Sequence, residues 1–226
     1  MLNIRKKSVF IIVIIVFLIA IKGEAQTYIG VKRGVSLSQI MFDDVDPTFN
    51  VEIVQEQTQG NITGFLLRFL QDKHAGLQFE INLIDKGWTQ VVNDDFKYKT
   101  ELKYLNIYAQ TIIVIGKRKF KPLLIGGPYI SYLYESDSPE IPDDQIENIP
   151  FVYDSDNDNE WDFGLGGGGG FSLETKIGNF QLVGKFSMGL SNIIDKQEDT
   201  EPEFSRNQTV EISLSYAYPF FKRKEE

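Results

Sequence analysis

The stretch that decides the fold is Thr209–Phe220, TVEISLSYAYPF. Every second residue is apolar: Val210, Ile212, Leu214, Tyr216, Tyr218 and Phe220. The residues between them are polar or small. Successive side chains of a β-strand point to opposite faces, so this alternation predicts a strand with one apolar face and one polar or small face.

Seven earlier stretches have related patterns and predict seven more strands: Tyr28–Ile40, Asn61–Leu70, Leu77–Leu83, Leu102–Ile115, Leu123–Tyr134, Trp161–Thr175 and Phe180–Leu190. Two of them are irregular. In Leu102–Ile115 the apolar face starts with Leu102 and Tyr104 and then changes phase, which predicts a β-bulge near Leu105. Leu123–Tyr134 is apolar on both faces and contains two glycines and Pro128.

The connections between these stretches alternate in length. Long or medium connections are expected at 39–59, 87–97, 135–160 and 192–206, and short ones at 71–75, 116–119 and 176–179. Most of the acidic residues fall in the long connections. Short turns at one end and longer loops at the other are typical of outer-membrane barrels. The sequence therefore predicts an all-β, up-and-down antiparallel transmembrane barrel of about eight strands.

The first 25 residues predict a cleaved secretory signal peptide. Arg5, Lys6 and Lys7 precede an apolar run of 13 residues, Val9–Ile21, and Gly23 and Ala25 supply small residues before a cleavage site. A permanent anchor helix is the alternative, but a bilayer span needs ~20 apolar residues. We therefore expect residues 1–25 to be the signal peptide and residues 26–226 to be one barrel domain exported to the bacterial outer membrane.

Composition excludes several classes of protein. The predicted cleavage removes four positive charges and one negative charge, so the formal charge of −9 becomes −12. Nucleic-acid binding needs a basic surface, so we expect no nucleic-acid partner. The chain has no cysteine, which excludes disulfides and thiolate metal sites. We expect no cofactor.

Charged residues on the predicted polar faces form the candidate interior network: Arg68, Glu80, Lys103, Glu174, Lys185 and Glu211, together with Gln78. An eight-stranded barrel is just wide enough for side chains to fill it. Opposite charges inside it are expected to pair, because an unpaired buried charge costs several kcal/mol. A lining for a narrow solute path is the functional alternative. Aromatic residues near strand ends are expected in the girdles at the lipid headgroups. These residues are Tyr28, Trp88, Tyr132, Tyr134 and Trp161.

Other motifs give weaker indications of chemistry. Asp154, Asp156 and Asp158 have the spacing that begins an EF-hand loop, but Asn159 and Leu165 occupy the positions of its glycine and bidentate glutamate, which leaves at most a loose divalent-ion site. The run Gly166–Gly170 lacks the lysine of a phosphate-binding loop and is expected to mark a tight place in the barrel wall. His74 is the single histidine, so neither a zinc set nor a catalytic triad is expected.

The order of motifs resembles the PorT-like outer-membrane barrel family of Bacteroidetes. The matching stretches are GVKRGVSLS (30–38), LKYLNI (102–107), KPLLIGGPY (121–129), DFGLG (162–166) and GLSNI (189–193). The resemblance implies an outer-membrane barrel, and some members of that family are linked to protein secretion or gliding machinery.

The function predicted from the sequence is a non-enzymatic, monomeric outer-membrane barrel. Beyond membrane lipid, its expected partner is a protein that contacts the acidic loops at 135–160 and 192–206. A soluble, secreted lipocalin-like barrel that binds a small apolar ligand is the alternative, with the apolar faces turned inward. A membrane-embedded enzyme is a third hypothesis, disfavoured because no nucleophile–base pair is evident.

Overall fold

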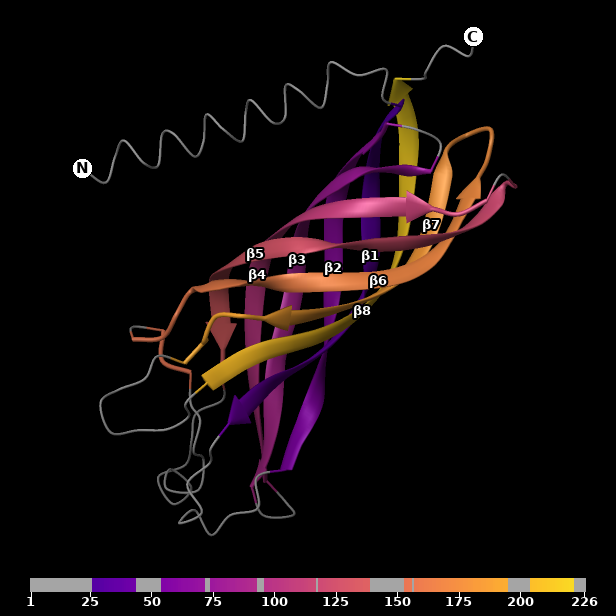
Figure 1. Cartoon of the computed structure of the whole chain (residues 1–226). Coiled ribbons are helices and arrows are strands. Elements are labelled where there is room, and N and C mark those ends of the chain that lie inside the picture. The colour runs from indigo at the N-terminus through magenta and orange to yellow at the C-terminus, as the bar shows by residue number, and fades with distance from the viewer. Residues whose placement is uncertain are drawn as a thin grey trace, which may run out of the picture.

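Eight antiparallel strands close into one barrel in sequence order, as predicted (Figure 1). The computed structural model describes residues 26–43, 54–71, 74–92, 96–116, 118–138, 153–155, 157–194 and 204–221; the expected signal peptide lies outside them. The strands are β1 (Gln26–Asp43), β2 (Val54–Leu70), β3 (Ala75–Val92), β4 (Phe96–Val114), β5 (Phe120–Asp137), β6 (Trp161–Glu174), β7 (Asn179–Gly189) and β8 (Phe204–Phe221). No helix among these residues is long and apolar enough to cross a membrane.

The strands are strongly tilted because the pairing is staggered. Moving from each residue to its paired neighbour, from Thr27 through β2 to β8, leads back to β1 at Leu37, ten residues further along. Such a stagger is the geometric requirement for closing a sheet into a barrel. β1 begins and β8 ends at the same end of the barrel, the upper end in Figure 1. The short connections after β2, β4 and β6 lie at that end too.

A continuous band of apolar side chains covers the outside of the barrel. Examples from different strands are Val31, Phe65, Ile81, Phe163 and Leu214, which are 52–68 % exposed. Buried polar side chains alternate with them, so the polar faces of the strands point inward. This arrangement contradicts the alternative of a soluble lipocalin-like barrel, which needs its apolar faces inside.

The connection between β3 and β4 is shorter than the sequence predicted. Residues 87–97 were expected as a loop, but β3 runs to Val92 and β4 begins at Phe96. The strict alternation of long and short connections is therefore wrong at this place. The outer surface of the extended part of β4 is charged rather than apolar. Lys97 donates to Glu56 at 2.7 and 2.6 Å, and Lys103 donates to Glu135 at 2.6 Å.

The predicted change of phase in β4 does not occur. Leu102 and Tyr104 are fully buried inside the barrel, and Leu105 and Ile107 continue the alternation on the outside. The register is irregular one strand away, because Lys103 pairs with Glu135 and Tyr104 pairs with Leu133. The extra residue, Tyr134, therefore belongs to β5. The prediction fails because Leu102 and Tyr104 are apolar residues of the interior, whereas the sequence pattern places them on the outer face.

The aromatic residues near strand ends divide between the two faces. Tyr132, Tyr134 and Trp161 are 36–54 % exposed on the outer surface, as a place in a girdle requires. Tyr28 and Trp88 are 3 % and 0 % exposed and lie inside the barrel. Their predicted place in a girdle is wrong, because periodicity alone does not tell an inward from an outward aromatic residue.

The glycine run 166–170 lies in β6 where the neighbouring backbones approach closely. A Cβ atom on Gly168 would lie 2.1 Å from the carbonyl oxygen of Gly184 in β7. A Cβ atom on Gly170 would lie 2.0 Å from the carbonyl oxygen of Leu182. Only glycine fits at positions 168 and 170 without moving the backbone, in agreement with the predicted tight place, whereas a Cβ atom on Gly167 would lie 3.6 Å from its nearest neighbour.

Apolar clusters occupy the two ends of the barrel interior. The cluster near the short turns consists of Tyr28, Leu66, Leu70, Ile112, Val114, Leu123, Ile125, Val183 and Ala217. The cluster at the opposite end consists of Ile40, Ile62, Ile84, Trp88, Leu102, Tyr104, Leu133, Tyr153 and Ile193. The polar residues described next lie between these two clusters.

Candidate functional site

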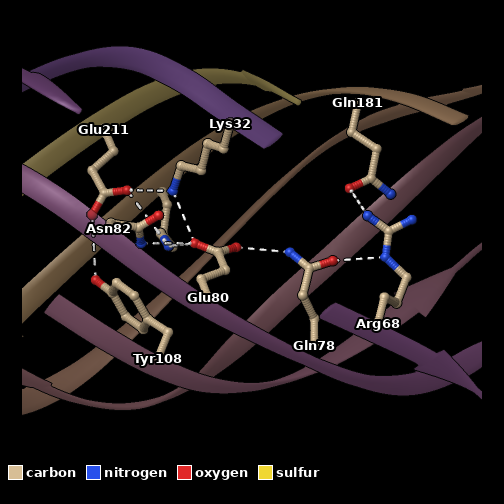
Figure 2. A network of polar contacts seen from close by, with 9 residues as sticks. Lys32, Arg68, Gln78, Glu80, Asn82, Tyr108, Gln181 and Glu211 are labelled. Atoms are coloured by element: carbon tan, nitrogen blue, oxygen red, sulfur yellow. Dashed lines mark hydrogen bonds and ion pairs between the residues drawn. The ribbon is translucent and has the colours of Figure 1, made fainter. Parts of the chain in front are cut away.

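Two lysines and two glutamates form the centre of the interior. Lys32 of β1 donates to Glu80 of β3 at 2.9 Å and to Glu211 of β8 at 3.1 Å (Figure 2). Lys185 of β7 lies 3.3 Å from Glu80 and 3.5 Å from Glu211. All four side chains are at most 4 % exposed. Two positive and two negative charges balance, which is the condition for burying ionised groups without a large penalty.

Tyr108 of β4 completes this centre. Its hydroxyl donates to Glu211 at 3.4 Å, and the ammonium of Lys185 lies 3.6 Å from its ring centroid. A cation over an aromatic face is stabilised by the ring quadrupole, most strongly when water is excluded. The ring therefore adds to the stabilisation that the two carboxylates give Lys185.

Arg68 forms the next layer, toward the short turns. Its Nε donates to Gln78 at 2.7 Å, and its two terminal nitrogens donate to Asn179 at 3.0 Å and Gln181 at 2.6 Å. Gln78 in turn donates to Glu80 at 2.7 Å, which links the two layers (Figure 2). Three neutral amide oxygens thus satisfy a guanidinium that is 1 % exposed.

Asp162 is the hub of a third layer, on the other side of the central four charges. It accepts hydrogen bonds from Lys86 at 3.0 Å, Asn207 at 2.9 Å, Tyr129 at 3.2 Å and Ser191 at 3.2 Å. Lys86 also lies 4.9 Å from the ring centroids of Tyr104 and Tyr129. This layer joins the polar interior to the apolar cluster that contains Trp88 and Tyr104.

Two residues of that cluster come from the connections between strands. Tyr153, 7 % exposed, and Ile193, fully buried, belong to the connections after β5 and β7. A backbone hydrogen bond from Asn159 to Ile193 at 2.9 Å joins the two connections, and one from Ile193 to Ser205 at 2.9 Å holds the second connection to β8. Burial and the carboxylates of Asp158, Glu160 and Asp154 raise the pKa of Tyr153 to about 12. We call Tyr153 and Ile193 the external lid.

The aspartates proposed as a loose ion site serve the turn that follows Tyr153. The backbone NH of Asp154 donates to the carboxylate of Asp158 at 2.7 Å, and the side chain of Asn157 donates to Asp154 at 2.7 Å. Asp156 lies outside the described residues. Within the described part of the chain, no group of three or more potential ligands could hold a metal ion.

The family follows from comparison with known proteins. A model of the outer membrane protein beta-barrel domain matches residues 24–195. The chain belongs to this family. Outer-membrane barrels have short periplasmic turns, so the connections after β2, β4 and β6 mark the periplasmic end and the external lid lies at the outer surface. A comparison with curated proteins finds no match.

Several solved outer-membrane proteins are similar to this chain at low sequence identity. The crystal structure of OprG from Pseudomonas aeruginosa is similar with a TM-score of 0.51 and 10 % identity, over 87 % of this chain and 97 % of that chain. The Neisserial surface protein NspA gives 0.44 and 10 % over 86 % and 97 %, and outer membrane protein W of E. coli gives 0.42 and 10 % over 88 % and 100 %. At such identity the likeness to OprG shows the fold alone.

Four of the six charged residues in the predicted interior network lie inside this outer-membrane barrel: Arg68, Glu80, Lys185 and Glu211. Lys103 and Glu174 do not join them. Lys103 points outward above the apolar band and pairs with Glu135, because Leu102 and Tyr104 take the inward positions. Glu174 lies at the periplasmic rim, where it pairs with Lys121 at 2.6 Å and is 44 % exposed.

Three charged residues of the interior were missed: Lys32, Lys86 and Asp162. Asp162 lies on the polar face of its strand, so the alternation of that strand was sufficient to predict its inward position. Lys32 is followed by Arg33, which puts a basic residue on each face of β1. The sequence therefore does not show which of the two residues points into the barrel. Lys86 falls in the stretch expected as a loop.

Proposed function

We propose that this chain is a non-conducting, non-enzymatic outer-membrane barrel that binds a protein partner at its external end. The strongest support for this proposal is that the protein's own side chains fill the barrel interior. Arg68, Trp88, Tyr104 and Tyr108 are at most 1 % exposed, and apolar clusters occupy both ends of the interior. A barrel whose bore is taken up by its own side chains does not bind a partner inside it, so the connections at its ends are the first candidates for partner binding.

The long acidic connections of the sequence follow β1, β5 and β7 at the external end, and the short connections after β2, β4 and β6 lie at the other end. Between positions 135 and 160 the sequence has ten acidic residues and no lysine or arginine. Charged surfaces favour partners of opposite sign, through both encounter rate and specificity. The proposed partner therefore presents a basic surface to these loops. The resemblance to PorT-like barrels of Bacteroidetes makes a component of protein secretion our first choice.

The partner role is tested by neutralising one loop and leaving the external lid intact. In the test variant, Glu140, Asp143, Asp144 and Glu147 become the corresponding amides. The matched control converts Glu56 and Glu101, on the outer strand surface, to glutamine. Both variants should insert and show the heat-dependent migration of a folded barrel, and only the loop variant should lose secretion in the cells that make this protein. Full secretion by the inserted loop variant contradicts the proposal.

The non-conducting part of the proposal has its own test. Purified barrel in planar lipid bilayers should give no stable conductance steps, since charged layers and apolar clusters lie across the path. Reproducible single-channel steps in the unmodified protein would show that the interior opens, and the lining for a solute path would then be the better hypothesis.

A further inference from the structure

A single arginine interrupts the apolar band on the outside of β1. Arg33 is exposed, and its neighbours on the same face are Ile29 and Val31 toward the periplasmic end and Val35 and Leu37 toward the external end. The four apolar side chains are 38–52 % exposed. Arg33 therefore lies in the middle of the apolar stretch of its strand, not at either edge.

The neighbouring strand β8 also places Arg33 within the apolar band. Its paired residue there is Leu214, 58 % exposed, with Ile212 and Val210 on the external side and Tyr218 and Phe220 on the periplasmic side. No described residue forms an ion pair or side-chain hydrogen bond with its guanidinium, whereas the adjacent Lys32 makes two ion pairs inside the barrel. Arg33 is thus a cation without a described partner in the middle of the apolar band, and we place the bilayer midplane at this level.

Lipid alone is a poor environment for this side chain. An arginine on the lipid face at the midplane lowers the ratio of folded to unfolded barrel roughly 30- to 700-fold. Phosphates lie at the membrane surfaces, about half of a ~25 Å apolar band away from the midplane. A charged side chain in such a place is expected to be paired and functional.

Polar residues of β2 extend from Arg33 toward the external surface. Thr63 is its paired residue, and Asn61 and Gln59 follow on the same outward face; all three are exposed. We call Arg33, Thr63, Asn61 and Gln59 the polar strip. Side-chain hydroxyl and amide groups that face hydrocarbon lack hydrogen-bond partners, whereas across a protein interface within a membrane they find them. The polar strip therefore places hydroxyl and amide groups beside Arg33 that can form hydrogen bonds with a second protein.

The chemistry of the missing partner is a carboxylate within the membrane. A second copy of this chain in the same orientation presents another Arg33 at this depth. The outward carboxylate on the adjacent part of β3, Asp85, lies beyond Leu83 at the external edge of the band and accepts from the backbone NH of Asn61 at 3.2 Å. Self-association therefore places like charges together at the midplane, which disfavours a dimer through this face.

We infer that the β1–β2 face is a docking surface for a different integral outer-membrane protein, whose lipid-facing wall places an aspartate or glutamate against Arg33. Thr63 and Asn61 supply hydrogen bonds, and Val31, Val35 and Leu214 supply the apolar surround. This surface is separate from the external loops, so it is independent of the partner proposed there.

The first experiment measures the isolated barrel in phospholipid vesicles. Arg33→Leu should raise the ratio of folded to unfolded protein on the order of 30- to 700-fold, because it removes an uncompensated charge from hydrocarbon. Val31→Leu, two positions away on the same face, should leave that ratio nearly unchanged. An Arg33→Leu variant no more stable than the natural protein would show that the charge of Arg33 is already compensated in lipid, and would overturn the inference.

The second experiment places a photo-crosslinking residue at Val35 in the full chain in living cells. We expect an adduct with another outer-membrane protein. Its yield should fall at least tenfold in Arg33→Leu and stay unchanged in Arg33→Lys. The yield should recover when Arg33→Glu is combined with a lysine in place of the partner's carboxylate residue. An adduct with a second copy of this chain, or one that does not respond to position 33, overturns the inference.

A crosslinker at Ile107, outward on β4, is the control. Its adducts should not respond to Arg33→Leu. If they fall in parallel with those at Val35, the substitution acts on the whole barrel and the docking surface is refuted.

Discussion

Lys32 and Glu80 lie 2.9 Å apart inside the barrel, although 48 positions separate them in the sequence and both side chains are about 4 % exposed. Glu211, the other carboxylate bound to Lys32, is 179 positions away. Ion pairs of this kind hold strands β1, β3 and β8 in one register. Their energetic importance follows from burial, because a charge left alone in the interior has no water to solvate it.

Lys32→Met should destabilise the barrel by about 3–5 kcal/mol, since it leaves two glutamates facing Lys185 alone. Lys32→Met combined with Glu80→Gln restores charge balance and should recover most of that loss. Denaturant unfolding in lipid vesicles measures both values. Lys97→Met is the matched control, because its partner Glu56 is exposed and such a pair contributes about 0–1 kcal/mol. Equal effects of Lys32→Met and Lys97→Met would contradict the role of burial.

Gly168→Ala should destabilise the barrel by about 1–3 kcal/mol, because the new Cβ would lie 2.1 Å from a backbone oxygen and the strands must separate. Gly184→Ala is the paired control, with its nearest neighbouring atom 4.0 Å from the new Cβ. The temperature at which each variant loses its folded migration in gels measures the difference. A Gly168→Ala barrel as heat-resistant as Gly184→Ala would contradict the close approach of β6 and β7.

The two tryptophans report opposite sides of the barrel wall. Trp88 is fully buried inside, and Trp161 is 54 % exposed on the outer surface. Fluorescence of a Trp88→Phe variant, which retains Trp161, should be quenched strongly by brominated lipids. The Trp161→Phe variant, which retains Trp88, should resist quenching by both brominated lipids and aqueous acrylamide. Strong lipid quenching of Trp88 would place it in the girdle that the sequence predicted.

Tyr153 of the external lid should ionise at about pH 12. The raised pKa means that the lid contributes its full stability below pH 10, the ordinary tyrosine value, and loses it as the pH rises through 12. The difference in ultraviolet absorbance between the natural protein and Tyr153→Phe isolates this one group during a titration. A midpoint near 10 would show that Tyr153 lies in water and that the lid is open.

Correct and incorrect sequence predictions divide according to the range of the interaction. Alternation in Thr209–Phe220 fixed the lipid face of β8, because the strand period of two is a property of the backbone alone. In β4 the same reasoning put Leu102 and Tyr104 outside, because apolar side chains also occupy the interior near its external end. Lys103 was then assigned to the wrong face, since a one-residue shift reverses every side chain.

The sequence by itself determined eight strands, most of them with one apolar face, and acidic connections between them, because alternation and composition are local properties. Only the tertiary structure decided which charges meet. The stagger of ten residues around the barrel sets which positions share a level, and it brings Lys32, Glu80, Lys185 and Glu211 together while it leaves Arg33 in the middle of the outer wall. Pairing register is a property of the closed sheet as a whole, so no single strand encodes it.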